Sequence, residues 1–297
     1  MKTRYETLRE QAETALSHCL PEHGGYAKVL EESARYSLLA GGKRLRPVLV
    51  LAAAQSMNVP LEEALPYACA IEMIHTYSLI HDDLPAMDND TLRRGRPTNH
   101  VVYGEAMAIL AGDGLLTHAF ALTAAHAMRY PAHAAAHLRA IRSVADAAGM
   151  EGMVAGQSLD VYCEKHGTDP EDEKGQLGYI HLNKTAAMIR GALLAGAELG
   201  EPTEEQRKAF ALYGEKLGVA FQVADDILDA VSTTEEMGKT VGKDEAEGKL
   251  TYVALYGVEA SRQHLARLTE EAIAAIRPVD KDGFFEQLAL DMLARKN

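Results

Sequence analysis

Two groups of three aspartates, far apart in the sequence, carry the residue type that binds hard divalent metal ions. The groups lie in the stretches DDLPAMD and DDILD, and consist of Asp82, Asp83 and Asp88 and of Asp225, Asp226 and Asp229. Both adjoin apolar residues, among which unneutralised carboxylates would repel one another and resist burial. Oxygen ligands without a neighbouring cysteine favour Mg²⁺, which commonly bridges carboxylates to substrate phosphates. The two groups therefore predict a magnesium site that binds a polyphosphate.

Local spacing supports this interpretation. Asp225 and Asp229 are four residues apart, so they share one face of a helix. Pro85 disfavours helix at the preceding residue, so the helix that carries the first group should end or bend there. Asp88 can then fold back toward Asp82. A solvated helix end would explain a single aspartate pair, but the second group favours the metal site.

Cationic residues accompany both groups. Arg93 and Arg94 follow the first group in the stretch LRRG, and arginine grips phosphate oxygens that a metal leaves free. Lys43 and Arg46, three residues apart in GGKRLRP, can point the same way. Lys184 lies in NKT inside an otherwise apolar helix, where a lone lysine could also extend to solvent.

The elements that must position these residues are helices. Helical periodicity predicts helices over 3–20, 27–40, 44–56, 61–84, 102–110, 114–128, 132–148, 151–163, 171–199, 203–231, 250–274 and 282–295. Breakers such as PEHGG, NVP and GEP separate them, and no run has convincing strand-like alternation. We therefore predict an all-α fold, a single helical-bundle domain over residues 1–297. The polar segment 232–249, with Lys239, is expected to be a surface loop and a lid over bound diphosphate.

Composition narrows the function classes. The formal net charge of −13 argues against nucleic acid as a general partner, because a phosphate backbone needs a broad basic surface. Three cysteines without metal spacing indicate a reduced, cytoplasmic protein. The charged N-terminal stretch lacks the apolar run of a signal peptide, and no unbroken apolar run reaches the roughly 18 residues of a membrane helix.

The sequence resembles the trans-isoprenyl diphosphate synthases. GGKRLRP, DDLPAMD, LRRG, GQSLD, NKT and FQVADDILD occur in that family's order and spacing, over nearly the whole chain. Within the family, the motifs are most similar to those of bacterial farnesyl diphosphate synthases. The resemblance implies an all-α homodimer with the active site in a central cavity between helices. It also implies the condensation of isopentenyl diphosphate with dimethylallyl and geranyl diphosphates to (2E,6E)-farnesyl diphosphate, with three Mg²⁺ ions per active site.

The resemblance also implies a role for each site residue. Mg²⁺ would be coordinated by Asp82, Asp88 and Asp225, and supported through water by Asp83, Asp226 and Asp229. The allylic diphosphate would be held by Arg93, Lys184 and Lys239, and isopentenyl diphosphate by Lys43, Arg46, His75 and Arg94. Thr185 and Gln222 would turn their dipoles toward the allylic cation. The allylic diphosphate ionises once its leaving group is neutralised, inside a cavity that excludes water. The alkene of isopentenyl diphosphate then adds to the cation, and a proton is lost.

Tyr77 and Ser78 are candidates for setting the product's length. They lie five and four residues before Asp82, about one helical turn deeper. A bulky Tyr77 there would act as a floor for the growing chain and give a fifteen-carbon product, and the resemblance implies the same. Tyr77 as an ordinary core residue is the alternative interpretation. A longer product, geranylgeranyl diphosphate, also stays open.

Two further function classes compete with this one. A terpene cyclase also uses aspartates and Mg²⁺, but it handles one substrate and does not need a second cationic set at Lys43, Arg46 and Arg94. A non-catalytic partner subunit of a prenyl synthase would be expected to lose one acidic group, and both groups are present.

Polar residues elsewhere in the predicted helices are given structural roles. His133 and His137 are four residues apart but have no acid at a metal-ligand offset, so we expect a solvated helix face. A core histidine is the alternative for His75. Gln157 and Asp160, in GQSLD, fit a packing or hydrogen-bond role as well as ligand contact.

Overall fold

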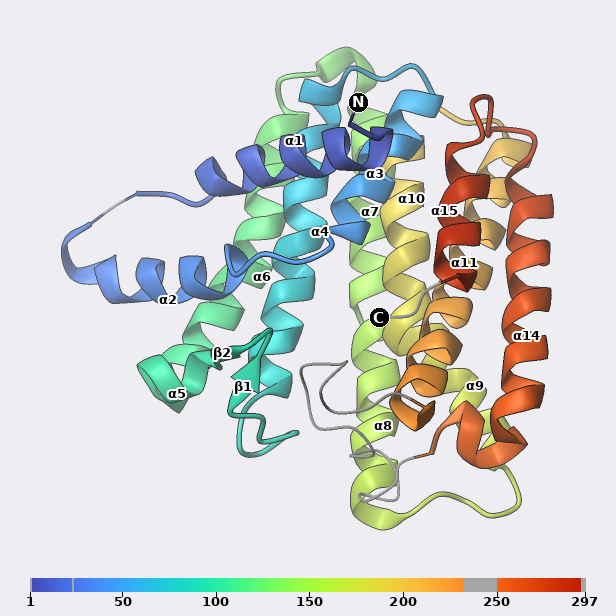
Figure 1. Ribbon diagram of the computed structural model, residues 1–297. Coiled ribbons are helices and arrows are strands. Elements are labelled where there is room, and N and C mark those ends of the chain that lie inside the picture. Colours follow the sequence, from blue (N-terminus) through green and yellow to red (C-terminus); the bar gives the residue numbers. More distant parts are fainter. Residues whose placement is uncertain (1, 23, 232–249, 295–297) are drawn as a thin grey trace. The chain divides into compact units, whose positions relative to one another are not determined.

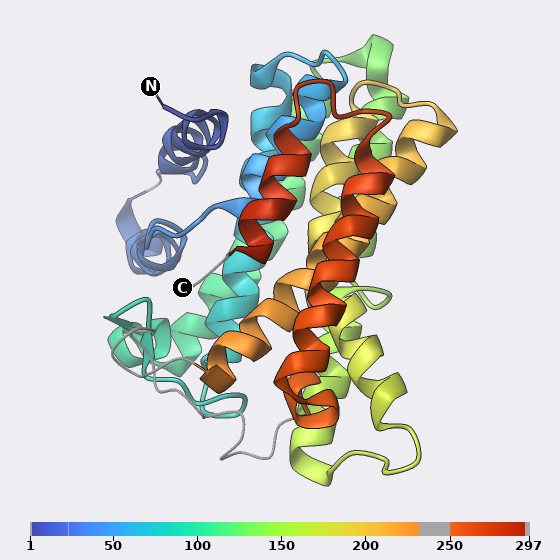
Figure 2. The same cartoon turned by 45° about the vertical axis from the view of Figure 1, so that its right-hand side comes forward.

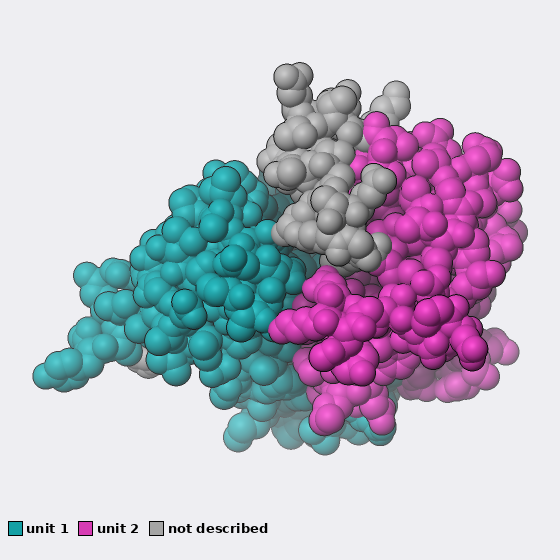
Figure 3. Space-filling view, turned by 90° about the horizontal axis from the view of Figure 1, so that it is seen from below, with its two compact units in different colours: residues 1–143, 195–201 teal, residues 144–194, 202–297 magenta. Residues whose placement is uncertain are grey.

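A computed structural model describes residues 2–22, 24–231 and 250–294 (Figures 1 and 2). The chain gathers into two compact units, which Figure 3 colours separately. Unit 1 comprises residues 1–143 and 195–201, and unit 2 comprises residues 144–194 and 202–297. A single domain over the whole chain therefore stays a prediction.

The elements of the chain are as follows. The first part contains α1 (Arg4–His18), η1 (Gly25–Ala27), α2 (Lys28–Leu38), α3 (Leu45–Ser56), α4 (Leu61–Asp82), β1 (Leu92–Arg93), β2 (Arg96–Pro97), α5 (Asn99–Tyr103), α6 (Glu105–Ala127) and η2 (Pro131–His133). The second part contains α7 (Ala134–Ala148), α8 (Met153–His166), α9 (Glu173–Ile180), the π-helical η3 (His181–Ala186), α10 (Ala187–Glu198), α11 (Glu204–Val231), α14 (Tyr252–Ile276) and α15 (Phe284–Leu293).

The all-α prediction is confirmed, with three local differences. The break predicted between residues 110 and 114 is absent, because α6 packs along α4 and tertiary packing overrides the low helix propensity of glycine. The helix predicted over 171–199 is divided by the π-helical turn η3. A two-residue antiparallel ladder, β1 with β2, closes through Arg94 and Gly95, both at positive φ (53° and 71°), as a two-residue hairpin turn requires.

The core of unit 1 is built on α3 and α4. Seven consecutive residues of α3, Val48–Ala54, have no exposed surface. Twelve of the 22 residues of α4 are buried, on all sides of the helix, because α3 and α6 both pack against it. Such a helix shows almost no amphipathic stripe in its sequence. This packing fixes the C-terminal end of α4, which carries the first aspartate group.

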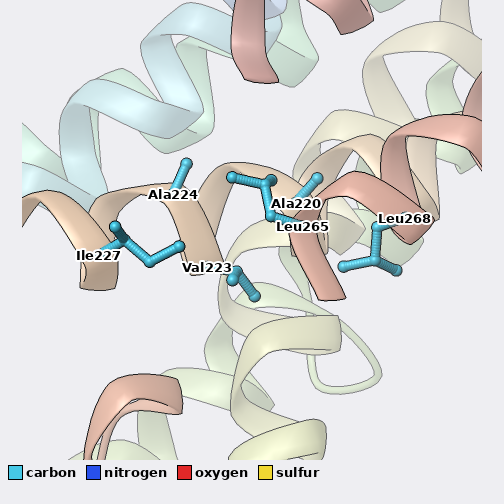
Figure 4. Packing of buried hydrophobic residues seen from close by; sticks show 6 residues of the cluster. All are labelled: Ala220, Val223, Ala224, Ile227, Leu265 and Leu268. Atoms are coloured by element: carbon cyan, nitrogen blue, oxygen red, sulfur yellow. The ribbon is translucent and has the colours of Figure 1, made fainter. Parts of the chain in front are cut away.

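The core of unit 2 joins α11 to α14. Ala220, Val223, Ala224 and Ile227 lie at positions i, i+3, i+4 and i+7 of α11, on one face of the helix, and meet Leu265 and Leu268 of α14 (Figure 4). The second aspartate group lies on the same stretch of α11: Asp225 and Asp226 stand between Ala224 and Ile227, and Asp229 follows two residues after Ile227. The apolar contact with α14 therefore sets how those aspartates are presented.

Among the described helices, only α6 is long and apolar enough to cross a membrane, judged by length and composition alone. This is weak evidence for a membrane span, because the core helix of a globular protein passes the same test. α6 packs against α4 and α2 within unit 1 and carries Asp113 in its apolar stretch.

The prediction of a solvated face at residues 133–137 is wrong for His137, which has no exposed surface. The Nδ1 atom of His137 lies 2.7 Å from the Tyr67 hydroxyl, and its Nε2 lies 3.2 Å from Glu63 Oε1. His126 and Tyr130 pack against the same imidazole. The sequence around His137 is mostly alanine, which marks neither face of the helix, so periodicity could not place this side chain. His133 is exposed, as predicted.

Acidification below pH 6.5 is expected to destabilise the protein through this histidine cluster. Burial lowers the pKa of His126 and of His137 below the ordinary value of 6.5, so the unfolded state binds more protons below that pH. The contribution of these neutral imidazoles to the free energy of unfolding is complete above pH 6.5 and is lost as the pH falls. Glu63 offsets part of the loss at His137. Urea unfolding at several pH values between about 5 and 8 measures the slope. His137→Asn should flatten it, and an unchanged slope would contradict the prediction.

Candidate active site

The first aspartate group lies where α4 ends. α4 stops at Asp82, as Pro85 predicts, and the chain folds back so that the backbone N–H of Asp88 donates to the carbonyl oxygen of Asp82 at 2.9 Å. Asp82 and Asp88 are half-buried, whereas Asp83 is 3% exposed. The predicted return of Asp88 toward Asp82 is confirmed.

Asp83 forms an ion pair that the sequence did not reveal. The guanidinium of Arg93 lies 2.7 Å (Nε) and 2.6 Å (Nη2) from Asp83 Oδ1. Burial raises the pKa of Asp83, and the adjacent Arg93 opposes that rise. The pair ties the β1–β2 hairpin to the end of α4 and fixes the position of Arg93. The role of Asp83 as a metal ligand through water stays a prediction.

A second set of contacts holds the hairpin, through residues that sequence reasoning missed. Asn99 Nδ2 donates to the Ser33 carbonyl and to Ser37 Oγ, both at 2.9 Å, while Asn99 Oδ1 accepts from Ser33 Oγ. The Tyr36 hydroxyl donates to the Pro97 carbonyl at 2.8 Å. Asn99 itself, two residues after the hairpin in the stretch RPTNH, was the available signal in the sequence. These bonds attach the hairpin to α2 and so position Arg93 and Arg94.

Arg94 reaches the glycine turn of GGKRLRP. Its Nη1 donates to the carbonyl oxygen of Gly41, and a Cβ on Gly42 would lie 2.8 Å from the same nitrogen. Gly42 also has a positive φ of 132°, which a residue with a side chain rarely adopts, so glycine suits this turn. Lys43 follows it on the surface, and its carbonyl accepts from the Tyr5 hydroxyl at 2.6 Å. The structure thus brings two predicted cationic segments, 53 residues apart, into contact.

His75 lies among these cations. Burial lowers its pKa well below the ordinary value, and the positive charges of Arg46, Arg94, Arg93 and Arg44 lower it further. His75 is therefore neutral near pH 7 and can offer an N–H donor to an anion without adding charge. Of the residues predicted to hold isopentenyl diphosphate, Arg46 and Arg94 therefore act electrostatically on this imidazole.

The two chain-length candidates differ in their surroundings. Tyr77 is 7% exposed and its ring meets that of His81 edge-on, with the centroids 5.7 Å apart. Burial raises the pKa of the Tyr77 phenol. Ser78 Oγ donates to the His75 carbonyl on its own helix. The described part of unit 1 holds a small cavity beside Thr76 and Ile80, of about 40 Å³, which has room for water but not for a prenyl chain.

In unit 2, the three aspartates of the second group lie on one helix, as predicted. Asp225 is half-buried, and Asp226 and Asp229 are 5% and 8% exposed. Neighbouring groups must therefore neutralise or hydrogen-bond three carboxylates within two helical turns.

Lys184 and Thr185 lie in the π-helical turn η3, a type of turn that is frequent at functional sites. Lys184 Nζ donates to Asp160 Oδ2 at 2.5 Å, which gives the GQSLD aspartate a hydrogen-bond role. A Cβ on Gly156 would lie 2.1 Å from the backbone nitrogen of Lys184. Gly156 therefore lets α8 approach η3 closely enough for Asp160 to reach the lysine.

A hydrogen-bonded chain links the remaining predicted residues of unit 2. Thr185 Oγ1 donates to Gln222 Oε1 at 3.0 Å, and Gln222 Nε2 donates to Asp226 Oδ1 at 3.1 Å. The backbone N–H of Tyr252 donates to Asp226 Oδ2 at 2.8 Å. His181 Nε2 lies 3.7 Å from Asp226 Oδ2, and burial lowers the pKa of His181 to about 4. His181 was missed, although its place three residues before Lys184 was a signal.

Two predictions about the site are not tested by the described residues. Lys239 and the predicted loop 232–249 lie outside the described residues. The first aspartate group belongs to unit 1 and the second to unit 2, so their sharing of one cavity stays a prediction.

The donor set fits magnesium better than a soft metal. Both groups supply carboxylate oxygens. Among the described residues, no three histidine, cysteine or acidic side chains lie close enough to hold a metal ion on their own. Magnesium tolerates this, because it usually keeps several waters and takes one or two carboxylates together with substrate phosphates.

Comparison with known proteins identifies the family. The sequence model of the polyprenyl synthetase family matches residues 27–283. The chain belongs to the polyprenyl synthetase family. It is 48% identical to the farnesyl diphosphate synthase of Geobacillus stearothermophilus, over 93% of this chain and 91% of that one. It is 44% identical to the geranylgeranyl diphosphate synthase of Cyanophora paradoxa, over 96% of this chain and 91% of that one.

The fold of this polyprenyl synthetase matches solved structures. A crystal structure of an FPP/GFPP synthase from Zymomonas mobilis superposes with a TM-score of 0.86 and 34% identity, over 97% of each chain. A geranyltransferase from Legionella pneumophila gives a TM-score of 0.85 at 32% identity, over 99% of this chain and 96% of that one. The predicted all-α fold of the trans-isoprenyl diphosphate synthases, the isoprenoid synthase fold, is therefore confirmed. The polyprenyl synthetases are prenyltransferases of isoprenoid biosynthesis that act on isoprenyl diphosphates with divalent metal ions.

Proposed function

We propose that this polyprenyl synthetase condenses isopentenyl diphosphate with dimethylallyl diphosphate and then with geranyl diphosphate, and releases (2E,6E)-farnesyl diphosphate. The main support is the number of cations that accompany the two aspartate groups. In unit 1, Arg93 binds Asp83 and Arg94 binds the glycine turn that precedes Lys43. In unit 2, Lys184 lies in the π-helical turn whose Thr185 bonds to Gln222. A condensation of two diphosphates needs cations for both, whereas a terpene cyclase binds one diphosphate.

The chain's own residues would bind, orient and shield the substrates. Arg93, Lys184 and Lys239 hold the allylic diphosphate, and Lys43, Arg46, His75 and Arg94 hold isopentenyl diphosphate. Thr185 and Gln222 present their dipoles to the positive charge that develops when the allylic bond breaks. No side chain is assigned as the general base, and the departing diphosphate takes the proton.

Magnesium is the proposed metal, with three ions per active site. In the assignment that the family resemblance implies, Asp82, Asp88 and Asp225 would hold it directly, and Asp83, Asp226 and Asp229 would support it through water. The bound ions would neutralise the charge of the leaving diphosphate and so lower the barrier to ionisation. This assignment rests on the carboxylate oxygens of the two aspartate groups and on the family's divalent-metal chemistry.

The test is to incubate the purified protein alone with geranyl and isopentenyl diphosphates, with and without Mg²⁺. Extracted products are then sized by mass spectrometry. A fifteen-carbon diphosphate that requires Mg²⁺ supports the proposal. Cyclised hydrocarbon would indicate a cyclase. No product, from protein that still binds a diphosphate analogue, would indicate a non-catalytic subunit.

The relatives are named for both fifteen- and twenty-carbon products. We infer the shorter one from Tyr77, a bulky buried side chain one turn before Asp82. Geranylgeranyl diphosphate is the second candidate product, because the 44% identical relative carries that name.

Tyr77→Ala is expected to shift the main product from fifteen to twenty carbons or more, because the truncation opens space for at least one further isoprene unit. Mass analysis of the products after exhaustive reaction measures this. Tyr77→Phe, which keeps the ring, should still stop at fifteen carbons. If Tyr77→Ala also releases only the fifteen-carbon product, Tyr77 is an ordinary core residue.

A homodimer and a cytoplasmic location complete the proposal. Ile109 and Leu110 on α6 are 43% and 54% exposed, and a third of the most apolar stretch of that helix is buried. A second copy of the chain would cover this apolar surface. The molar mass in solution, measured by light scattering, tests it.

A further inference from the structure

We propose that Asp226 is a positioning residue rather than a metal ligand: its carboxylate sets the orientation of the Gln222 amide and holds the first turn of α14. The proposal rests on the proposed function for its catalytic consequence. It revises the role that the resemblance implies for Asp226, and it separates this residue from its neighbour Asp225.

Both carboxylate oxygens of Asp226 accept hydrogen bonds from the chain itself. Oδ1 accepts from Gln222 Nε2 at 3.1 Å, and Oδ2 accepts from the backbone N–H of Tyr252 at 2.8 Å. The side chain is 5% exposed, whereas Asp225, one residue earlier, is half-buried. A backbone donor at the start of a helix cannot leave Asp226 without moving α14. Each carboxylate oxygen of Asp226 therefore already has a partner within the chain.

The bond to Asp226 decides which way the Gln222 amide faces. A carboxylate accepts only, so the NH₂ group of Gln222 must point at it and the carbonyl oxygen must point away. That oxygen accepts the hydroxyl proton of Thr185 at 3.0 Å. With the amide reversed, Gln222 would present its N–H groups toward Thr185 and repel a developing cation. Asp226 thus fixes the sign of the dipole that the two residues present.

The contact with Tyr252 is braced by aromatic rings. The imidazole of His181 is 4% exposed, stacks on the Tyr252 ring with centroids 5.7 Å apart, and has Nε2 3.7 Å from Asp226 Oδ2. The Tyr252 ring also stacks on the imidazole of His264, with the ring centroids 4.8 Å apart. Thr251 caps α14 by accepting from the Ala254 N–H. The start of α14 is therefore held to α11 through Asp226 and to η3 through His181.

Two substitutions at Asp226 separate its two bonds. In Asp226→Asn, the amide oxygen can still accept from Tyr252, but the new NH₂ group faces the NH₂ of Gln222 and forces that amide to reverse. We expect kcat to fall by about 10- to 100-fold, while the Mg²⁺ concentration for half-maximal rate stays within about twofold. Asp225→Asn is the matched control and should raise that Mg²⁺ concentration by at least about tenfold.

Amide hydrogen exchange supplies a readout that does not need activity. Asp226→Ala should speed exchange in the first turn of α14 by at least about tenfold, because the Tyr252 N–H loses its acceptor. Asp226→Asn and Asp225→Ala should leave that exchange near the parent's rate. Circular dichroism confirms that each variant is folded, and the comparison uses only those that are.

Three outcomes decide the proposal. An Mg²⁺ requirement that rises as much in Asp226→Asn as in Asp225→Asn would make Asp226 a metal ligand and overturn it. Unchanged exchange in Asp226→Ala would also overturn it. A parent protein without prenyl transfer would instead refute the proposed function, and the exchange result would still decide whether Asp226 holds α14.

Discussion

Replacing Asp82 with asparagine is expected to lower kcat for the condensation of geranyl and isopentenyl diphosphates on the order of 10³-fold. The carboxylate ends α4 beside the point where Asp88 folds back, and it is half-buried, so it can face a bound cation. An amide keeps the shape of the side chain but offers one neutral oxygen to Mg²⁺ in place of a charge. Without that charge, the leaving diphosphate is poorly neutralised and ionisation slows.

Steady-state rates across a range of Mg²⁺ concentrations measure the effect, and excess Mg²⁺ should restore only a small part of it. Asp113→Asn is the matched control, an acid on α6 in the same unit with a side chain 60% exposed, and it should keep the parent's rate. Both variants should unfold at the parent's urea midpoint within error. Asp82→Asn with more than a tenth of the parent's kcat would remove Asp82 from the metal site.

Local rules predicted the parts of the site that depend on a few neighbouring residues. Helical spacing placed Asp225, Asp226 and Asp229 on one helix, and Pro85 placed the end of α4 and the return of Asp88. Both follow from backbone geometry within one or two turns, which the sequence states directly.

Long-range pairings were not predictable in the same way. Nothing near Asp83 in the sequence says that Arg93 will bond to it, and nothing near Asp226 indicates the backbone of Tyr252, 26 residues later. His137 was misplaced because alanines surround it on both faces of α7. In each case the deciding energy is the cost of burying a polar group without a partner, and the partner comes from a distant segment.

Arg44 also has long-range partners that the sequence does not indicate, and its replacement has the largest expected effect on the free energy of unfolding. It stands between Lys43 and Arg46 in GGKRLRP, yet it is 5% exposed and has a left-handed backbone (φ 53°). Its Nη1 lies 2.6 Å from Glu72 Oε1 on α4, and its Nη2 donates to the Leu38 carbonyl at 2.8 Å. Arg44 therefore connects the start of α3 to α4 and to the end of α2.

Arg44→Met is expected to lower the free energy of unfolding by about 3–5 kcal/mol, because it leaves the Glu72 carboxylate buried without its cation. Arg44→Met combined with Glu72→Leu should recover much of that loss, since no charge is then buried. Arg207→Met is the matched control at an exposed ion pair with Glu204, and should cost less than about 1 kcal/mol. Urea unfolding at neutral pH measures all three. A loss below about 1 kcal/mol for Arg44→Met would mean that water reaches Glu72. In that case the cations that flank Arg44 would not owe their positions to this buried pair.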